Sequence, residues 1–241
     1  MNRWLNRGLA RGPVRPRILT PMLRDERKKS TRLALRRVAV RLFKERGFAE
    51  TTVEQIAAAA GVSTRTFFNY FATKDEAVML PYDDISLLVR DECERRPFDE
   101  SPYDTARAAA HAAFAFLAAD DDLRRLLLDA ARLLRGDATL RAADAALQLV
   151  WEDELGRSLR DRSPGLDPLA SRVQAAAAVA ATRAGVFAWA EDEQASTAST
   201  ESLFFAIDAA FAALRAGGVP VVALHHGRDA GRCRAEARRA G

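Results

Sequence analysis

The sequence predicts an all-α protein of about nine helices, arranged as a small N-terminal domain and a larger C-terminal one. Apolar residues recur at spacings of three and four along most of the 241 residues. No segment shows the alternation or the β-branched runs of a strand. Capping residues, glycines and prolines divide the chain into segments of helical length. A hydrophobic fraction of 49% is enough for a folded core.

The first predicted helix carries one apolar stripe and ends at Gly47, a residue that suits the C-terminal cap. Basic side chains lie off this stripe, at positions 36, 37, 41 and 44. The stripe consists of Leu35, Val38, Ala39, Leu42 and Phe43.

Two short helices and a longer one are expected next. Thr51 lies three residues before Glu54, which is the spacing of a capping box, and Gly61 ends the helix that it opens. Its inward residues are expected to be Val53, Ile56, Ala57 and Ala60. Ser63 can cap a second short helix that extends to about Tyr70. Thr73 and Glu76 form another capping-box pattern, which predicts a long fourth helix continuing past Leu88.

Five further helices are predicted from their start signals. These signals are Ser101 with Pro102, the aspartates 120–122, Gly136 with Asp137, Asp167 with Pro168, and Thr200 with Glu201. Helix eight is expected over Pro168 to about Ala190, and helix nine is expected to end at Gly217 and Gly218.

Charge is distributed unevenly along the chain. The net charge is +5 in residues 1–21, +6 in 22–75, −10 in 76–216 and +3 in 217–241. This asymmetry is expected when one module binds a polyanion and the other does not. We therefore expect a basic, mobile N-terminal arm (1–27), a first domain (28–75), a second domain (76–218) and a basic, mobile C-terminal tail (219–241).

The two short helices have the length and the glycine turn of a helix-turn-helix. In that motif the second helix lies in the DNA major groove, so it needs one buried face and one polar face. Phe67, Phe71 and Phe68 are expected to form the buried face. Thr64, Arg65, Thr66 and Asn69 are expected to face outward.

A phenylalanine stripe alone is more often ordinary core, but several features coincide here. They are the glycine turn, the two capping boxes, the basic first helix and Lys74, which is placed to reach a phosphate. Together they predict a DNA-binding protein.

Residues 33–80 resemble the DNA-binding domain of the TetR family of bacterial transcriptional regulators. The resemblance is centred on "FKERGFAETTVEQIAAAAGVSTRTFFNYFATKDEAV", residues 43–78. It implies a cytoplasmic homodimer that binds a palindromic operator, acts as a repressor and is released by a small-molecule effector. It also implies that the C-terminal domain dimerises and binds this effector.

The resemblance also implies which residues contact DNA. Thr64, Arg65, Thr66 and Asn69 fall where the family contacts bases and phosphates, and Thr52 and Lys74 match phosphate contacts. Ser63 belongs to this group as the cap of the recognition helix. Tyr70 falls where the family often has a phosphate-contacting histidine. Phe68 departs from the usual tyrosine and has no hydroxyl to donate.

In the C-terminal domain, helix eight carries the small-residue stretch "QAAAAVAATRAG", which lets another helix approach closely. Helices eight and nine are expected to form the homodimer interface that the resemblance implies. An effector pocket is expected among helices four to eight. Its candidate residues, each of a type that more often serves core or interface packing, are His111, Phe114, Trp151, Arg183 and Phe187.

Two other classes of function are weaker alternatives. An enzyme is disfavoured because "DDLRR" lacks the second aspartate of a DDxxD metal site and the acidic clusters lack spaced His or Cys partners. No Walker, GxSxG or GxGxxG motif is present, so we expect neither a catalytic site, a metal nor a cofactor. A non-specific architectural DNA-binding protein with basic tails remains the second reading.

The N-terminal region shows no export signal, because arginines interrupt the first twenty residues. The apolar run 175–181 is too short to predict a membrane span. Met22 heads "MLRDERKKS", so translation from Met22 and a DNA-tracking arm over residues 1–21 are competing explanations of the long lead-in.

Overall fold

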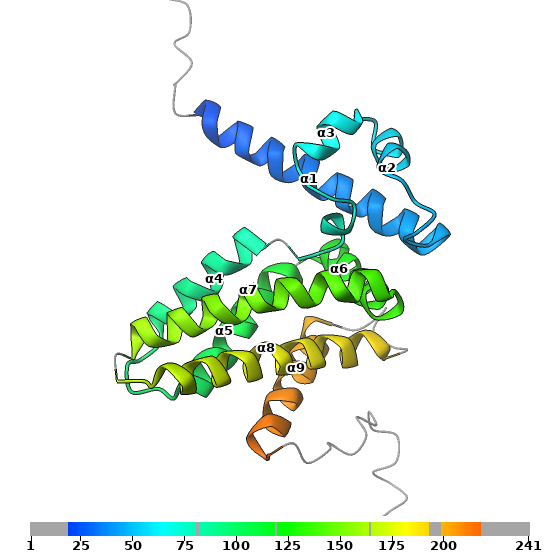
Figure 1. Cartoon of the computed structure of the whole chain (residues 1–241). Helices are drawn as coiled ribbons and strands as arrows, with labels where there is room; N and C mark the ends of the chain where they lie inside the picture. Colours follow the sequence, from blue (N-terminus) through cyan, green and yellow to red (C-terminus); the bar gives the residue numbers. More distant parts are fainter. Residues whose placement is uncertain (1–18, 81, 119, 164, 193–198, 218–241) are drawn as a thin grey trace, which may run out of the picture. The chain divides into compact units, whose positions relative to one another are not determined.

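The computed structural model describes residues 19–80, 82–118, 120–163, 165–192 and 199–217 (Figure 1). In these ranges the chain forms nine α-helices, one short 3-10 helix and no strand, which confirms the predicted all-α class. It divides into two compact units, the first ending at Val78 and the second beginning at Met79. The predicted tail over 219–241 and residues 1–18 of the predicted arm lie outside the described residues.

The N-terminal unit contains α1 (Leu19–Arg46), α2 (Val53–Ala59), α3 (Thr64–Phe68) and the 3-10 helix η1 (Asp75–Ala77). The helix α1 begins earlier than the boundary of the predicted arm, so residues 19–27 are helical. Proline at position 21 is compatible with this start, because N–H groups in the first turn have no partner within a helix.

The core of this unit lies between α1, α2 and α3. Phe71, which follows α3, also belongs to it. Leu35, Ala39 and Phe43 of α1 are fully buried. They are joined by Ile56 of α2 and by Phe67 of α3. The helix α2 packs against both α1 and α3, which holds the short α3 in place although five residues are too few for a stable isolated helix.

The capping residue of α2 is Thr52, and the prediction of Thr51 was wrong by one position. The hydroxyl of Thr52 accepts a hydrogen bond from the Gln55 N–H at 3.3 Å, and the Gln55 side chain accepts from the Thr52 N–H at 3.1 Å. The Thr51 side chain is buried and its hydroxyl donates to the Gly47 carbonyl at 2.8 Å. Both threonines therefore fix the loop between α1 and α2.

The predicted long fourth helix from Thr73 was also wrong, because two elements replace it. The chain forms η1, leaves helical conformation, and begins α4 (Tyr82–Arg95) only afterwards. The sequence has proline at position 81, which disfavours helical conformation in the residue before it. Glu76 serves a local turn instead, since its carboxylate accepts from the Ala72 N–H at 2.6 Å.

The C-terminal unit continues with α5 (Pro102–Ala118), α6 (Asp121–Gly136), α7 (Ala138–Arg162), α8 (Pro168–Glu191) and α9 (Thr200–Arg215). Three of the predicted start signals are confirmed as side-chain caps. The carboxylates of Asp120, Asp137 and Asp167 accept hydrogen bonds from the first-turn N–H groups of α6, α7 and α8.

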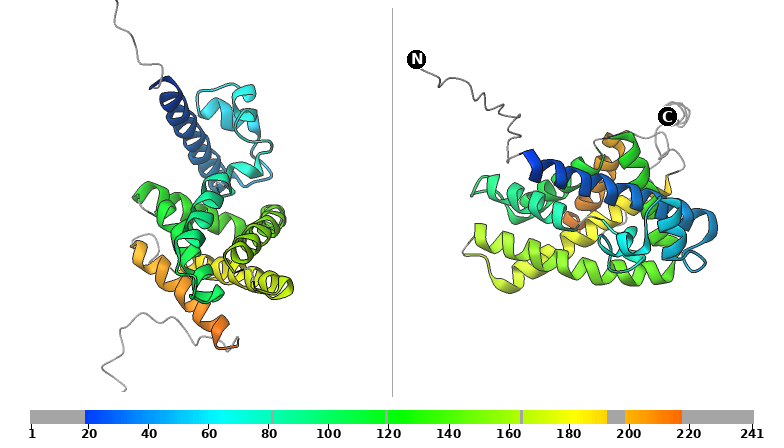
Figure 2. Two further views of the ribbon diagram at one scale, coloured as in Figure 1. Left: turned by 90° about the vertical axis from the view of Figure 1, so that its left-hand side faces the viewer. Right: turned by 90° about the horizontal axis from the view of Figure 1, so that it is seen from above.

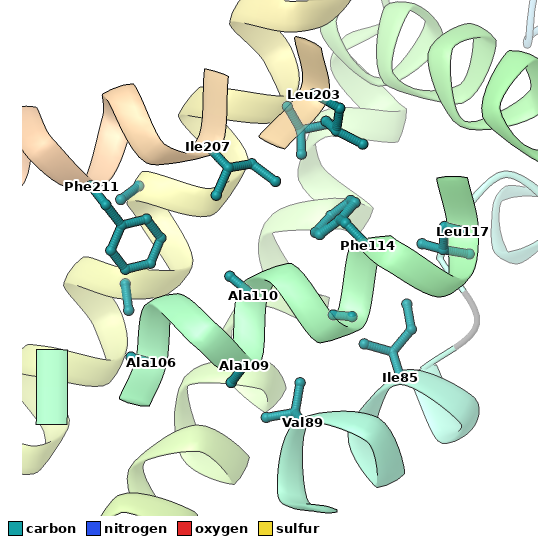
Figure 3. Close-up of a cluster of buried hydrophobic side chains, with 14 of the residues drawn as sticks. Ile85, Val89, Ala106, Ala109, Ala110, Phe114, Leu117, Leu203, Ile207 and Phe211 are labelled. Carbon is teal, nitrogen blue, oxygen red and sulfur yellow. The ribbon is translucent and has the colours of Figure 1, made fainter. Parts of the chain in front are cut away.

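Within this unit α8 packs against both α7 and α9 (Figure 2). Figure 3 shows α5 between α9 and α4, with Ile207 and Phe211 on one side and Ile85 and Val89 on the other. At Gly185 the two helices α8 and α9 touch backbone to backbone. A Cβ atom there would lie 2.7 Å from Ile207 Cα, so only glycine allows this approach.

By length and composition α8 is apolar enough to cross a membrane. The core helix of a globular protein passes the same test, so this finding is weak evidence. Eight residues of α8, including Ala175, Ala178 and Trp189, are buried in the fold. Its apolar character therefore has an explanation within the C-terminal unit.

Candidate functional site

Two short helices, α2 and α3, are joined by a tight turn in the N-terminal unit. Gly61 has a φ of +70°, a conformation that residues with a Cβ rarely adopt. The Val62 N–H donates to the Ala57 carbonyl at 2.9 Å, and the Gly61 N–H donates to the Ala58 carbonyl at 3.1 Å. These bonds satisfy the end of α2 and turn the chain directly into α3.

The second helix of this pair is anchored at its start and along one face. The Ser63 hydroxyl accepts a hydrogen bond from the Thr66 N–H at 3.1 Å, which confirms the predicted cap. The rings of Phe67 and Phe71 are buried with their centroids 5.3 Å apart. A helix fixed in this way presents its opposite face in a defined orientation.

That opposite face is polar and basic. Arg65 and Asn69 are exposed, whereas Thr64, Thr66 and Tyr70 are half-buried. Thr66 also contacts the Ser63 hydroxyl through its own hydroxyl, at 2.9 Å. Thr52 is exposed at the start of α2, with its side chain in the capping box. Among the predicted DNA-contacting residues at positions 64–70, Arg65 and Asn69 are therefore the most accessible.

Phe68 belongs to this exposed surface and not to the core, where it was expected. Its side chain is 54% exposed. Its ring meets the buried Phe67 ring edge to face, with centroids 5.6 Å apart. Adjacent positions on a helix point in different directions, and in this short helix Phe67 faces inward while Phe68 faces outward. The 3.6-residue periodicity was the signal that could have shown this.

Lys74 has a set of contacts that the sequence did not indicate. Its ammonium group donates to the carbonyl oxygens of Phe48 at 2.8 Å, Thr51 at 2.9 Å and Ala49 at 3.5 Å. It also lies 4.2 Å from the centroid of the Phe48 ring. An ammonium group has three hydrogens, so all of them have an acceptor within the protein. A phosphate contact by Lys74 would have to replace one of these bonds.

A cavity of about 110 Å³ lies in the C-terminal unit, among α4, α5, α6, α7 and α8. Most of its wall is apolar, formed for example by Leu80, Val89 and Leu127. Four predicted pocket residues line it, namely Phe114, Trp151, Arg183 and Phe187.

His111 does not line the cavity. Its Nε2 lies 2.9 Å from Asp208 Oδ1 of α9, and its ring stacks on Phe204 at a centroid distance of 4.8 Å. Arg107 donates to the same Asp208 oxygen at 3.0 Å. His111 therefore belongs to a polar contact between α5 and α9.

One part of the cavity wall is polar and comes from α7 and α8. Gln148 Nε2 donates to Asp144 Oδ1 at 3.2 Å, while Thr182 and Arg183 line the cavity from α8. Burial raises the pKa of the Asp144 carboxyl, although the Gln148 hydrogen bond and the Arg183 charge act in the opposite direction. Asp144 and Arg183 are the only charged residues in the cavity wall within the described chain.

Sequence reasoning missed Asp144 and Gln148, although a signal was present. The α7 residues Asp144, Gln148, Trp151 and Leu155 lie four, three and four positions apart, so they share one helix face. Two polar side chains on an otherwise apolar face are unusual unless they contact something.

The comparisons with known proteins support the assignment of the N-terminal unit. Residues 35–78 match the model of the bacterial regulatory proteins of the tetR family. The HTH-type transcriptional regulator TcmR of Streptomyces glaucescens is 40% identical over 92 residues, which span 38% of this chain and 41% of TcmR. The match to TcmR thus covers less than half of each protein.

Two crystal structures resemble a larger part of the chain. One comes from Syntrophomonas wolfei, is assigned to the TetR family of transcriptional regulators and is 17% identical to this chain. The match covers 81% of this chain and 99% of that chain. Its TM-score of 0.53 shows a shared fold. The other is Thermus thermophilus FadR, a TetR-family repressor in complex with lauroyl-CoA, which is 27% identical and covers 81% of this chain and 99% of that one. Its TM-score of 0.46 is too low to compare the details of a cavity.

A metal site would need a cluster of at least three His, Cys, Asp or Glu side chains, and the described part of the chain contains none. The helix-turn-helix geometry, the all-α fold and the family match agree with one another. The N-terminal unit therefore resembles the DNA-binding domain of the bacterial regulatory proteins of the tetR family.

Proposed function

We propose that this protein is a homodimeric repressor that binds an inverted-repeat operator and is released by a small molecule. The observation that carries the proposal is α3, which is capped by Ser63, anchored by Phe67 and exposes Arg65 and Asn69. A helix of this kind can enter the major groove, where arginine reads guanine and asparagine reads adenine.

The remaining predicted contacts position the protein on the phosphate backbone. The hydroxyls of Thr64, Thr66 and Tyr70 and the N-terminal turn of α2 at Thr52 are the proposed phosphate contacts. Phe68 cannot donate to a phosphate, but its exposed ring can pack against sugar or the methyl group of thymine. The excess of basic residues in 22–75 supplies the non-specific attraction to DNA.

A homodimer through α8 and α9 would place two such helices on one operator. Leu169 and Val173 of α8 are 69% and 59% exposed, and Phe205 of α9 is 54% exposed. Large apolar side chains on neighbouring helices favour a self-complementary, two-fold interface. A two-fold dimer reads half-sites about one DNA turn apart, roughly 34 Å, and so requires an inverted repeat.

The proposed effector site is the cavity in the C-terminal unit. A ligand that prefers the DNA-free conformation of the protein weakens DNA binding. By linkage, DNA weakens the binding of the ligand by the same factor. This relation is how the cavity would control repression. Action on chromosomal DNA places the protein in the cytoplasm.

The experiment is selection of genomic DNA fragments by the purified full chain, followed by sequencing and by footprinting of the enriched fragments. The expected result is an inverted repeat bound at least 10³-fold more tightly than random DNA, the ratio usual for specific regulators. Equal affinity for the selected fragments and for random DNA would instead support the architectural DNA-binding protein and would overturn the operator proposal.

A further inference from the structure

The cavity wall has an apolar part and a polar part, and the polar part carries the half-buried carboxylate of Asp144. The helices α4, α5 and α6 contribute only apolar side chains, such as Ile85, Ala110 and Leu134. The carboxylate of Asp144 enters from α7 and accepts a hydrogen bond from the amide of Gln148 at 3.2 Å. A molecule that fills this space must therefore match an apolar surface and one acidic group.

The two charged residues of the wall differ in their access to water. Arg183 is exposed, so solvent and salt screen its charge. Asp144 is half-buried, and burial is the largest influence on the pKa of its carboxyl, which is raised. Neither Gln148 nor Arg183 fully compensates the carboxylate for its loss of water. The acid is therefore the less satisfied charge of the two.

A cationic group on the ligand would supply the Asp144 carboxylate with an opposite charge and a further hydrogen-bond donor. An ammonium group can donate a charge-assisted hydrogen bond to Asp144, and such bonds are about twice as strong as neutral ones. The aromatic rings of Trp151 and Phe114 also line the cavity, and aromatic faces attract cations, whereas the Phe187 ring already has the Arg135 guanidinium 5.7 Å from its centroid. Acid and aromatic rings thus favour the same class of molecule.

We propose that the effector cavity selects apolar amines, with Asp144 pairing with the protonated nitrogen and the α4–α6 wall holding the apolar body. This inference rests on the proposed regulatory function for its biological meaning, but binding itself can be measured without DNA. A cavity of about 110 Å³ is near the size that holds one aromatic ring in an engineered apolar cavity. Small arylalkylamines are therefore suitable probes.

The test compares three probes with one carbon skeleton, namely 4-phenylbutylamine, 4-phenylbutanol and 4-phenylbutyrate. Their binding to the full chain is measured by titration calorimetry at pH 7.5. The amine is expected to bind at least tenfold more tightly than the alcohol, and the carboxylate is expected to bind most weakly. Asp144→Asn, which keeps the shape and a partner for Gln148, should reduce the amine to the affinity of the alcohol.

Arg183→Gln is the matched control, because it removes the other charge of the wall. It should leave the preference for the amine intact or increase it. Tightest binding of 4-phenylbutyrate, lost in Arg183→Gln, would overturn the proposal and assign recognition to Arg183. An amine preference that survives in Asp144→Asn would also overturn it, as would absence of binding by all three probes.

Operator binding, measured on the same preparations by fluorescence anisotropy, separates this inference from the function on which it rests. Asp144→Asn should bind operator DNA as the unchanged protein does when no probe is present. Amine binding without operator selectivity would refute the regulatory function alone. Operator selectivity without amine preference would refute the ligand class alone.

Discussion

Lys74 joins two parts of the N-terminal unit that are distant in the sequence. Its ammonium group donates to three carbonyl oxygens in the loop between α1 and α2, and Lys74 itself lies just before η1. The loop carbonyls of Phe48 and Thr51 would otherwise need water or another donor. The side chain therefore fixes the loop that precedes the first helix of the DNA-binding motif.

Lys74→Met tests this structural role, since it removes the ammonium group but keeps an apolar side chain over the Phe48 ring. We expect the free energy of unfolding to fall by about 1 to 3 kcal/mol, because the carbonyls lose a charged donor. Chemical denaturation without DNA measures this loss. The predicted phosphate contact is tested by measuring DNA binding of the same variant at several salt concentrations. If the contact exists, the slope of log affinity against log salt concentration should fall by about one. Unchanged stability would refute the structural role.

Arg65 is the exposed cation of α3 and the proposed reader of a base. Arg65→Ala is expected to weaken operator binding by roughly 1 to 3 kcal/mol and to relax the preference at one base-pair position in each half-site. Arg157→Ala, on α7 in an exposed pair with Glu154, is the control and should change nothing. An equal loss on operator and random DNA would show that Arg65 only positions the protein. Asn69→Ala is expected to behave as Arg65→Ala does.

Glu100 gives a prediction of pH dependence. Its carboxylate accepts hydrogen bonds from Arg96, and this partner lowers the pKa of Glu100 to about 2. A lowered pKa stabilises the fold above the ordinary glutamate pKa, and the contribution disappears as pH falls from about 4 towards 2. Glu100→Gln should therefore cost about 1 to 2 kcal/mol at pH 7, because water partly screens the half-exposed Arg96.

The measurement for Glu100 is the thermal midpoint of both proteins between pH 7 and pH 3. Their difference should begin to shrink below about pH 4, since the glutamate of the unfolded chain then becomes protonated whereas Glu100 of the folded protein is still ionised. Glu45→Gln, which breaks the exposed pair with Arg41, is the control and should cost much less. A difference that is constant over this pH range would contradict the ion-pair explanation.

At the scale of elements, the sequence predicted the helix starts that aspartates cap, but it misplaced the cap at Thr51 and missed the break after η1. Asp120, Asp137 and Asp167 act on N–H groups two or three residues away, so their role is readable locally. The break between η1 and α4 replaced a predicted continuous helix, although proline at position 81 was visible. The small-residue stretch that ends at Gly185 predicted a close helix approach, but it did not show that the partner is α9 of the same chain, because that partner lies elsewhere in the sequence.

Gly185→Ala tests this approach. The new methyl group would lie 2.7 Å from Ile207 Cα and 2.8 Å from the Ala206 carbonyl oxygen. Backbone atoms cannot move aside as a flexible side chain can, so we expect a loss of about 1 to 3 kcal/mol in the free energy of unfolding. Gly136→Ala is the matched control, since the space around Gly136 is open. There, alanine should be neutral or slightly stabilising. Equal effects of the two substitutions would contradict the packing argument.

At the scale of the whole molecule, the sequence predicted the class of protein and four of the residues that line the cavity, but it did not predict the acidic group of the cavity. The charge asymmetry and the motif of residues 43–78 lie within continuous segments, so both were readable. The cavity combines residues of five helices, so the only local signal for its acidic group was a polar residue on an apolar face of α7, and that signal was overlooked. The proposed dimer interface likewise depends on faces that only the fold assembles.

Val173→Asp tests the proposed dimer. The side chain is 59% exposed and, four residues after Leu169, lies on the same face of α8. Two aspartates brought together by a two-fold axis would be desolvated and would repel each other, so the dimer should dissociate. Leu149→Asp on α7, which is also an exposed apolar residue, is the control outside the proposed interface. Analytical ultracentrifugation should give a monomer for Val173→Asp and a dimer for Leu149→Asp.

The monomer should still bind DNA through α3, but it should lose the preference for an inverted repeat over a single half-site, because one recognition helix reads only one half. If Val173→Asp remains a dimer, the interface lies elsewhere. If the monomer still prefers the inverted repeat, that preference does not come from the two-fold symmetry of a dimer.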